Sequence, residues 1–247
     1  MLVLHRDDPV TVALVEAIHT GDLAVLGRLL GEQQGLASAR IEDNAGRSVT
    51  PLHAATDWPG HFPNGAAVVT ALIEAGADPN APVVGFGHAE TALHWAASSD
   101  DVEVADALLD AGACIEAPGA SIAGGSPLDD AVGYGQWQVA RRLVERGARV
   151  SKLWHAAALG MMSRVEEYFA TTTRPAPEDV NEAFWQACHG GQRRAAEYLL
   201  ARGADLNSLP GYADKTALDI VTAVGSRRQA LASWLREQGI RSADEPR

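Results

Sequence analysis

The sequence predicts an all-α chain built from repeated helix pairs. The segment TPLHAA at residues 50–55 nearly recurs as TALHWAA at residues 91–97, and an apolar run of helical spacing follows each one. Both runs end in Gly-Ala, at Gly76 and at Gly112. A Thr hydroxyl can cap the free N–H groups that open a helix, and a Gly in the left-handed conformation can end one. The segments therefore read as two copies of one helical unit.

These segments resemble the ankyrin repeat, in which a Thr-Pro-Leu-His-x-Ala turn opens two helices with a period of about 33 residues. The resemblance implies a solenoid of stacked helix pairs, which favours binding over catalysis because a stack offers an extended surface instead of a closed cavity. We expect a single continuous ankyrin-repeat domain over residues 1–240 and a polar C-terminal tail over residues 241–247. About seven helix-turn-helix units are expected, at Val12–Leu30, Thr50–Ala77, Thr91–Ala113, Ser126–Ala148, Ser151–Gly160, Phe184–Asp205 and Thr216–Gly239.

Composition narrows the class of partner. The formal net charge of −12 argues against nucleic acid and against an anionic membrane, since both require a basic face. No apolar run approaches the length of a membrane span, and the first residues do not form a signal peptide. The only cysteines, Cys114 and Cys188, fit a reducing compartment. We therefore expect a monomeric cytoplasmic protein without a cofactor.

The resemblance also implies where a partner docks. In ankyrin repeats the end of the first helix of each unit faces the concave surface. In this sequence that position predicts a strip along the concave face, formed by Asp57, Trp58, Ser98, Ser99, Tyr134 and His189. Trp and Tyr are common anchors in interfaces, so the strip predicts a protein or peptide partner that brings a basic or aromatic group. In the alternative, Trp58 folds beneath its own loop and Tyr134 packs on Trp137.

Two loops depart from the repeat pattern and predict a second kind of site. The insertion Pro59–Pro63 carries His61, and the loop Gly85–His88 carries His88. With Asp57 and Asp101 they would form a pocket for a small molecule or for an unusual enzyme activity. No metal-ligand spacing accompanies these residues, so no metal is expected. An enclosed cavity favours this alternative, whereas an open groove favours the non-catalytic binding scaffold.

Other conspicuous residues are expected to support the fold. His53 and His94 occupy the signature histidine position, where the side chain bridges loop backbones between repeats. Asp129 is expected to cap a helix, and Cys188 is expected to be a buried, inert thiol. The aromatic residues next to the alanine pairs are expected to fill the core between repeats: Trp95, Trp154 and Trp185.

Overall fold

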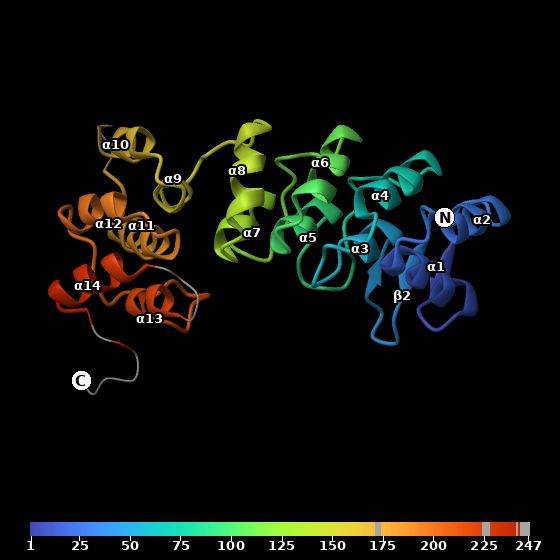
Figure 1. Ribbon diagram of the computed structural model, residues 1–247, viewed down its shortest axis with the longest axis horizontal. Helices are drawn as coiled ribbons and strands as arrows, with labels where there is room; N and C mark the ends of the chain where they lie inside the picture. The colour runs from blue at the N-terminus through green and yellow to red at the C-terminus, as the bar shows by residue number, and fades with distance from the viewer. Residues whose placement is uncertain (171–173, 224–227, 241, 243–247) are drawn as a thin grey trace. The chain divides into compact units, whose positions relative to one another are not determined.

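The computed structural model describes residues 1–170, 174–223, 228–240 and 242 (Figure 1). Its contacts divide the chain into two compact units, Met1–Ala148 and Arg149–Arg247. The single domain over residues 1–240 stays a prediction. Of the expected tail over residues 241–247, only Ser242 is among the described residues.

The first unit contains four helix pairs arranged in two layers. The first helices of the pairs contact one another in series, from α1 through α3 and α5 to α7, and the second helices do the same from α2 to α8. The pairs are α1 (Pro9–Thr20) with α2 (Leu23–Glu32), α3 (Pro51–Ala55) with α4 (Gly65–Glu74), α5 (Ala92–Ser98) with α6 (Val102–Asp110), and α7 (Pro127–Gly133) with α8 (Trp137–Glu145).

The second unit contains three further pairs. Here α9 contacts α11, α11 contacts α13, and α10 contacts α12, so the same layering is repeated. The described residues thus hold seven helix pairs, which confirms the predicted all-α solenoid. The pairs are α9 (Leu153–Ala158) with α10 (Met162–Ala170), α11 (Pro177–His189) with α12 (Arg193–Leu200), and α13 (Ala217–Thr222) with α14 (Gln229–Glu237).

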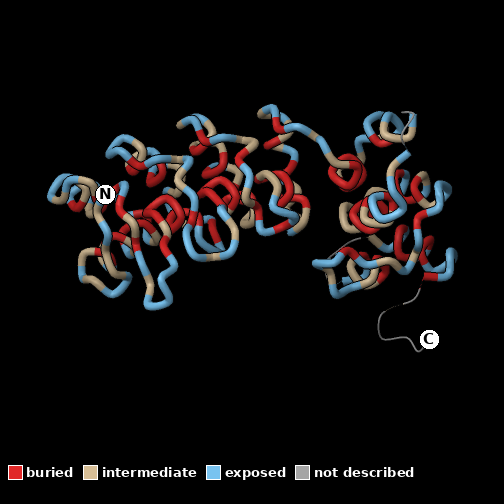
Figure 2. The backbone as a smooth tube through the Cα atoms, turned by 180° about the vertical axis from the view of Figure 1, so that it is seen from behind, coloured by how far each residue is buried: buried red, intermediate tan, exposed pale blue. Residues whose placement is uncertain are grey.

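The core of each unit lies between its helix layers, and Figure 2 shows the buried residues in red along the helices. The second helices contribute leucines that are fully buried, among them Leu108 in α6 and Leu199 in α12. The first helices contribute small residues such as Ala96 and Ala97, which are also fully buried. Small residues on one layer and leucines on the other let adjacent repeats pack closely.

Four first helices begin with the same reciprocal cap. In each, the N-cap side chain accepts a hydrogen bond from the third helical residue, whose own side chain accepts one from the N-cap backbone. The third residue is a histidine in two of them and an aspartate in the other two, which confirms the capping role expected of Asp129. The pairs are Thr50 with His53, Thr91 with His94, Ser126 with Asp129, and Thr216 with Asp219.

The first unit also contains a small sheet that the sequence analysis did not predict. Strand β2 (Arg40–Glu42) lies between β1 (Val3–His5), which is parallel to it, and β3 (Ser48–Val49), which is antiparallel. Ser48 of β3 also exchanges two backbone hydrogen bonds of 2.9 Å with Val84, which lies outside the three strands. These contacts join the first finger loop to the next one.

Candidate functional site

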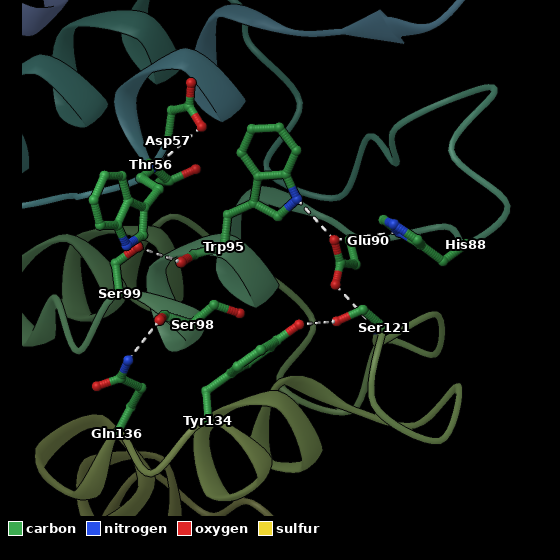
Figure 3. A pocket seen from close by; sticks show the side chains of 11 residues that line it. Thr56, Asp57, His88, Glu90, Trp95, Ser98, Ser99, Ser121, Tyr134 and Gln136 are labelled. Carbon is green, nitrogen blue, oxygen red and sulfur yellow. Dashed lines mark hydrogen bonds and ion pairs between the residues drawn. The ribbon is translucent and has the colours of Figure 1, made fainter. Parts of the chain in front are cut away.

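A pocket of about 450 Å³ lies in the first unit, where α3, α5 and α7 end (Figure 3). Asp57 and Trp58 follow α3, Ser98 ends α5, and Tyr134 follows α7. These are equivalent positions in three successive repeats, so stacking brings them to one place. The pocket is lined by Thr56, Asp57, Trp58, His88, Glu90, Trp95, Ser98, Ser99, Ser121, Tyr134 and Gln136.

Two of the predicted site residues line a neighbouring hollow instead. His61 and Asp101 belong to a space of about 300 Å³ beside α6. The His61 backbone N–H donates to Asp101 Oδ2 at 2.8 Å, and Asp101 Oδ1 accepts the Val104 N–H at 3.2 Å. The His61 ring lies 3.0 Å from the Ser99 carbonyl oxygen. Asp101 thus caps α6 and fastens the inserted loop to it.

His189, the remaining predicted residue, belongs to the second unit. It is half-buried at the end of α11, and its ring centre lies 5.1 Å from that of Trp185. Burial lowers the pKa of His189 to about 4, and the Arg228 guanidinium acts in the same direction. Arg228 also donates to the His189 carbonyl oxygen. These contacts fix the residue within its own unit.

The aromatic side chains of the pocket differ in exposure. Trp58 is 81% exposed and Tyr134 is 49% exposed, so the alternative in which Trp58 folds beneath its own loop is wrong. The Tyr134 hydroxyl lies 3.0 Å from Ser121 Oγ. Trp95 is half-buried and lines the pocket, so it does not simply fill the core as predicted; Trp154 and Trp185 are buried as expected.

Glu90 forms the floor of the pocket, a role that the repeat pattern of the sequence does not predict. The residue is only 5% exposed, yet its carboxylate is well bonded (Figure 3). Oε1 accepts the Ser121 N–H at 2.9 Å, and Oε2 accepts the Trp95 indole N–H at 2.9 Å. His88 Nδ1 lies 3.2 Å from the same Oε2. The only signal in the sequence is that Glu90 lies directly before the Thr91 cap.

A second carboxyl group, Asp130, lies behind the pocket and is fully buried. Its Oδ1 accepts hydrogen bonds from Ser121 Oγ at 3.1 Å and from the Ile122 N–H at 3.0 Å. Burial raises the pKa of Asp130 to about 8, and the negative charge of Glu90 adds to the rise. Its surroundings therefore favour the protonated form of this carboxyl group over the charged form.

His53 links two neighbouring repeats below the pocket. Its Nδ1 accepts the Thr50 N–H at 3.3 Å, and its Nε2 donates to the Glu90 carbonyl oxygen at 3.2 Å. Burial lowers the pKa of His53 to about 4, which keeps the ring neutral as this bonding requires. The bridging role predicted for this histidine is confirmed.

A family model described as ankyrin repeats (3 copies) matches residues 64–152. Residues 64–152 thus match an array of ankyrin repeats. Among solved structures, the ankyrin repeat domain of human ASB11 is similar to this chain with a TM-score of 0.50 and 22% sequence identity. The similarity covers 88% of this chain and 95% of that one, and at such identity it shows the fold alone. Comparison with curated proteins gave no match.

Ankyrin repeats are generally scaffolds for protein–protein interaction. The described residues include no group of three His, Cys, Asp or Glu side chains that could hold a metal ion. Across the same part of the chain, every helix is too short or too polar to cross a membrane. The lining of the pocket consists of aromatic rings, hydroxyl groups, carboxylates, an imidazole and an amide.

Proposed function

We propose that the protein is a non-catalytic binding scaffold that holds a protein or peptide partner on its concave face, at the pocket where α3, α5 and α7 end. The observation that carries the proposal is the 81% exposure of Trp58 at this pocket. An exposed indole keeps a large apolar surface in contact with water, which is unfavourable, and a docked partner removes that surface from water. Trp and Tyr dominate the binding energy of many interfaces. Tyr134, which is 49% exposed, supplies a second anchor.

The alternative is a small-molecule site or an unusual enzyme built over Asp57, His61, His88 and Asp101. The volume of the pocket, about 450 Å³, supports it, because small-molecule sites commonly span about 300–1,000 Å³. Against it, His61 and Asp101 line a different hollow from Asp57 and His88. The scaffold function is therefore the better supported of the two.

Selection of random displayed peptides on the immobilised full chain tests the proposal. The selected peptides are then measured by fluorescence anisotropy against the wild type, Trp58→Ala and Tyr134→Ala. Each substitution is expected to weaken binding by more than about 1 kcal/mol, the level that separates anchors from bystanders. Leu23→Ala is the matched control, because Leu23 is 42% exposed and does not line the pocket.

Two results would contradict this function. Unchanged affinity in both pocket variants, with normal melting temperatures, would place the binding surface elsewhere. Severe unfolding of both variants, with unaltered affinity in the fraction that remains folded, would show that Trp58 and Tyr134 are packing residues.

We also propose that the protein acts in the cytoplasm as a monomer. Cys114 and Cys188 are both free thiols, and Cys188 is fully buried as predicted. Unpaired cysteines are typical of reducing compartments, which supports the location. Size-exclusion chromatography with light scattering tests the oligomeric state.

A further inference from the structure

The pocket offers hydrogen-bond acceptors and few donors. The hydroxyl groups of Ser98 and Ser99 donate to the carbonyl oxygens of His94 at 3.0 Å and of Trp95 at 3.1 Å. The Thr56 hydroxyl likewise donates into α3, and the Trp95 indole donates to Glu90. Their hydrogens are therefore already used inside the protein, while their oxygens can still accept.

The same holds on the opposite wall. The Ser121 hydroxyl donates to Asp130, so at the Ser121–Tyr134 contact of 3.0 Å the tyrosine is the donor. The phenol oxygen of Tyr134 keeps its lone pairs for a ligand. The donors that remain in the lining are the Trp58 indole, His88 and one amide hydrogen of Gln136, whose Nε2 donates to the Ser98 carbonyl oxygen at 2.7 Å. A ligand rich in donors suits this lining, and an anion does not.

The charge of the pocket favours a cation. Two carboxylates, Asp57 and Glu90, line it, and its eleven lining residues include no Lys or Arg. Asp57 Oδ1 accepts the Trp58 N–H at 2.8 Å, while Oδ2 accepts no hydrogen from the described residues. The guanidinium of Arg47 lies over the Phe86 ring and is already paired with a carboxylate, since its Nη2 lies 2.7 Å from Asp43 Oδ2. The net charge of −12 acts in the same direction over a longer range.

The aromatic lining distinguishes between kinds of cation. Trp58, Trp95 and Tyr134 all contribute to the pocket, so a bound group meets ring surface as well as acceptors. A guanidinium is flat, weakly hydrated and carries five N–H donors, so it can stack on a ring while it bonds at its edge. A lysine ammonium is compact and strongly hydrated, and it uses such a lining less well.

We propose that this pocket binds the guanidinium group of an arginine side chain on the peptide partner. This proposal names the chemical group that occupies the binding site proposed above, so it rests on the proposed scaffold function. The guanidinium bonds to the free oxygen of Asp57 and to the hydroxyl and carbonyl oxygens of the lining. Its faces pack against the aromatic rings, and the Glu90 carboxylate supplies a buried negative charge below it.

The probe is N-acetyl-arginine N-methylamide, titrated into the uniformly ¹⁵N-labelled full chain while the indole N–H resonances are followed. The citrulline analogue is nearly isosteric but uncharged, and the lysine analogue carries an ammonium. We expect saturable shifts of the Trp58 and Trp95 indole signals with the arginine probe. We also expect its Kd to be lower than that of either analogue by about fivefold or more.

A pair of variants with matched charge tests the role of Asp57. Asp57→Asn is expected to raise the Kd of the arginine probe about threefold or more, because it removes the exposed charge of the pocket. Glu74→Gln removes one negative charge from an exposed position on α4, outside the pocket, and is expected to leave the Kd unchanged. An equal increase of the Kd in the two variants would show that the effect comes from net charge alone, and it would overturn the inference.

The analogue series separates the two proposals from each other. If selected peptides bind at Trp58 and Tyr134 but the arginine and citrulline probes bind equally, the guanidinium assignment is wrong and the scaffold function stands. Tighter binding of the lysine analogue would also overturn the assignment. If the arginine probe binds selectively while no peptide does, the pocket is a small-molecule site, and the scaffold function fails instead.

Discussion

The His53 imidazole donates a hydrogen bond to the main-chain oxygen of Glu90, 3.2 Å away in the next repeat, while the Glu90 side chain forms the floor of the pocket. One residue therefore takes part both in the stacking of repeats and in the lining of the pocket. The side chain is held by Ser121 and Trp95, each at 2.9 Å, so the floor of the pocket is fixed before a ligand arrives.

The buried His53 predicts a loss of stability in mild acid. Its pKa is about 4 in the folded protein and about 6.5 when unfolded, so below pH 6.5 only the unfolded chain takes up the proton. This contribution is complete above pH 6.5 and is lost as the pH falls toward 4. In urea denaturation, the stability lost by the wild type between pH 7 and 5 is expected to exceed that lost by His53→Gln by about 2 kcal/mol. Equal losses in the two proteins would show that His53 takes up no extra proton on unfolding.

Asp130 predicts a dependence of the opposite sign. Its pKa is raised from 3.8 to about 8, so between these values the folded protein keeps a proton that the unfolded chain releases. Its contribution to stability is therefore lost as the pH rises through this window, by at most about 1.4 kcal/mol per pH unit. Asp130→Asn removes the titration and is expected to gain stability relative to the wild type from pH 5 to pH 8. Parallel stability curves for the two proteins would contradict the assignment of a protonated Asp130.

The leucines of the second helices are expected to carry much of the stability. Leu108→Ala and Leu199→Ala should each lower the free energy of unfolding by about 2–5 kcal/mol, since both side chains are fully buried between layers. Leu209→Ala is the control, because Leu209 is 42% exposed, and it should change stability by less than about 0.5 kcal/mol. Chemical denaturation measures all three; a negligible effect at position 108 or 199 would contradict the assigned packing.

Two glycines with positive φ allow the cost of backbone strain to be distinguished from the cost of a steric clash. Gly119 has φ +119°, and a Cβ there would lie 2.6 Å from the Ala89 carbonyl oxygen; Gly112 has φ +88° and open space around it. Both alanine variants bear the cost of the positive φ, but only Gly119→Ala must also displace backbone. We expect it to destabilise by about 1 kcal/mol or more beyond Gly112→Ala, measured by thermal unfolding. Equal effects would show that the backbone at Ala89 yields without cost.

Removal of metal ions is expected to leave the protein unchanged. The sequence offers no ligand set of recognisable spacing, so EDTA should not alter the melting temperature. A clear loss of melting temperature that zinc restores would contradict this expectation. His61 and His88 would then be the first ligands to test.

The helix pairs were predictable because their signals are local. A cap such as Thr91 and a stop such as Gly112 act within a few residues of where they stand, and the same signals recur along the chain. The small sheet was not predictable, because Val3 pairs with Arg40 and no strand exceeds three residues. Such short strands carry no alternation that a sequence pattern can reveal.

The lining of the pocket was predictable where it follows the repeat. Asp57, Ser98 and Tyr134 lie together because equivalent positions in successive repeats face the same space. Glu90 was missed because its role depends on Ser121, which belongs to a loop of the next repeat. The expected cluster of His61 and Asp101 with His88 required the inserted loop to lie over the pocket, but that loop is tied to α6 instead.

Under the proposed function, the inserted loop after α3 is the place where the choice of ligand can change while the core between the repeats is kept. Trp58 stands at the mouth of the pocket and is 81% exposed, whereas the floor at Glu90 cannot be altered without disturbing Trp95 and Ser121. Variation among related chains should therefore gather at the mouth while the floor is conserved. An engineer who wants a new ligand should begin at Trp58 and Asp57, where a substitution leaves the joints between repeats intact.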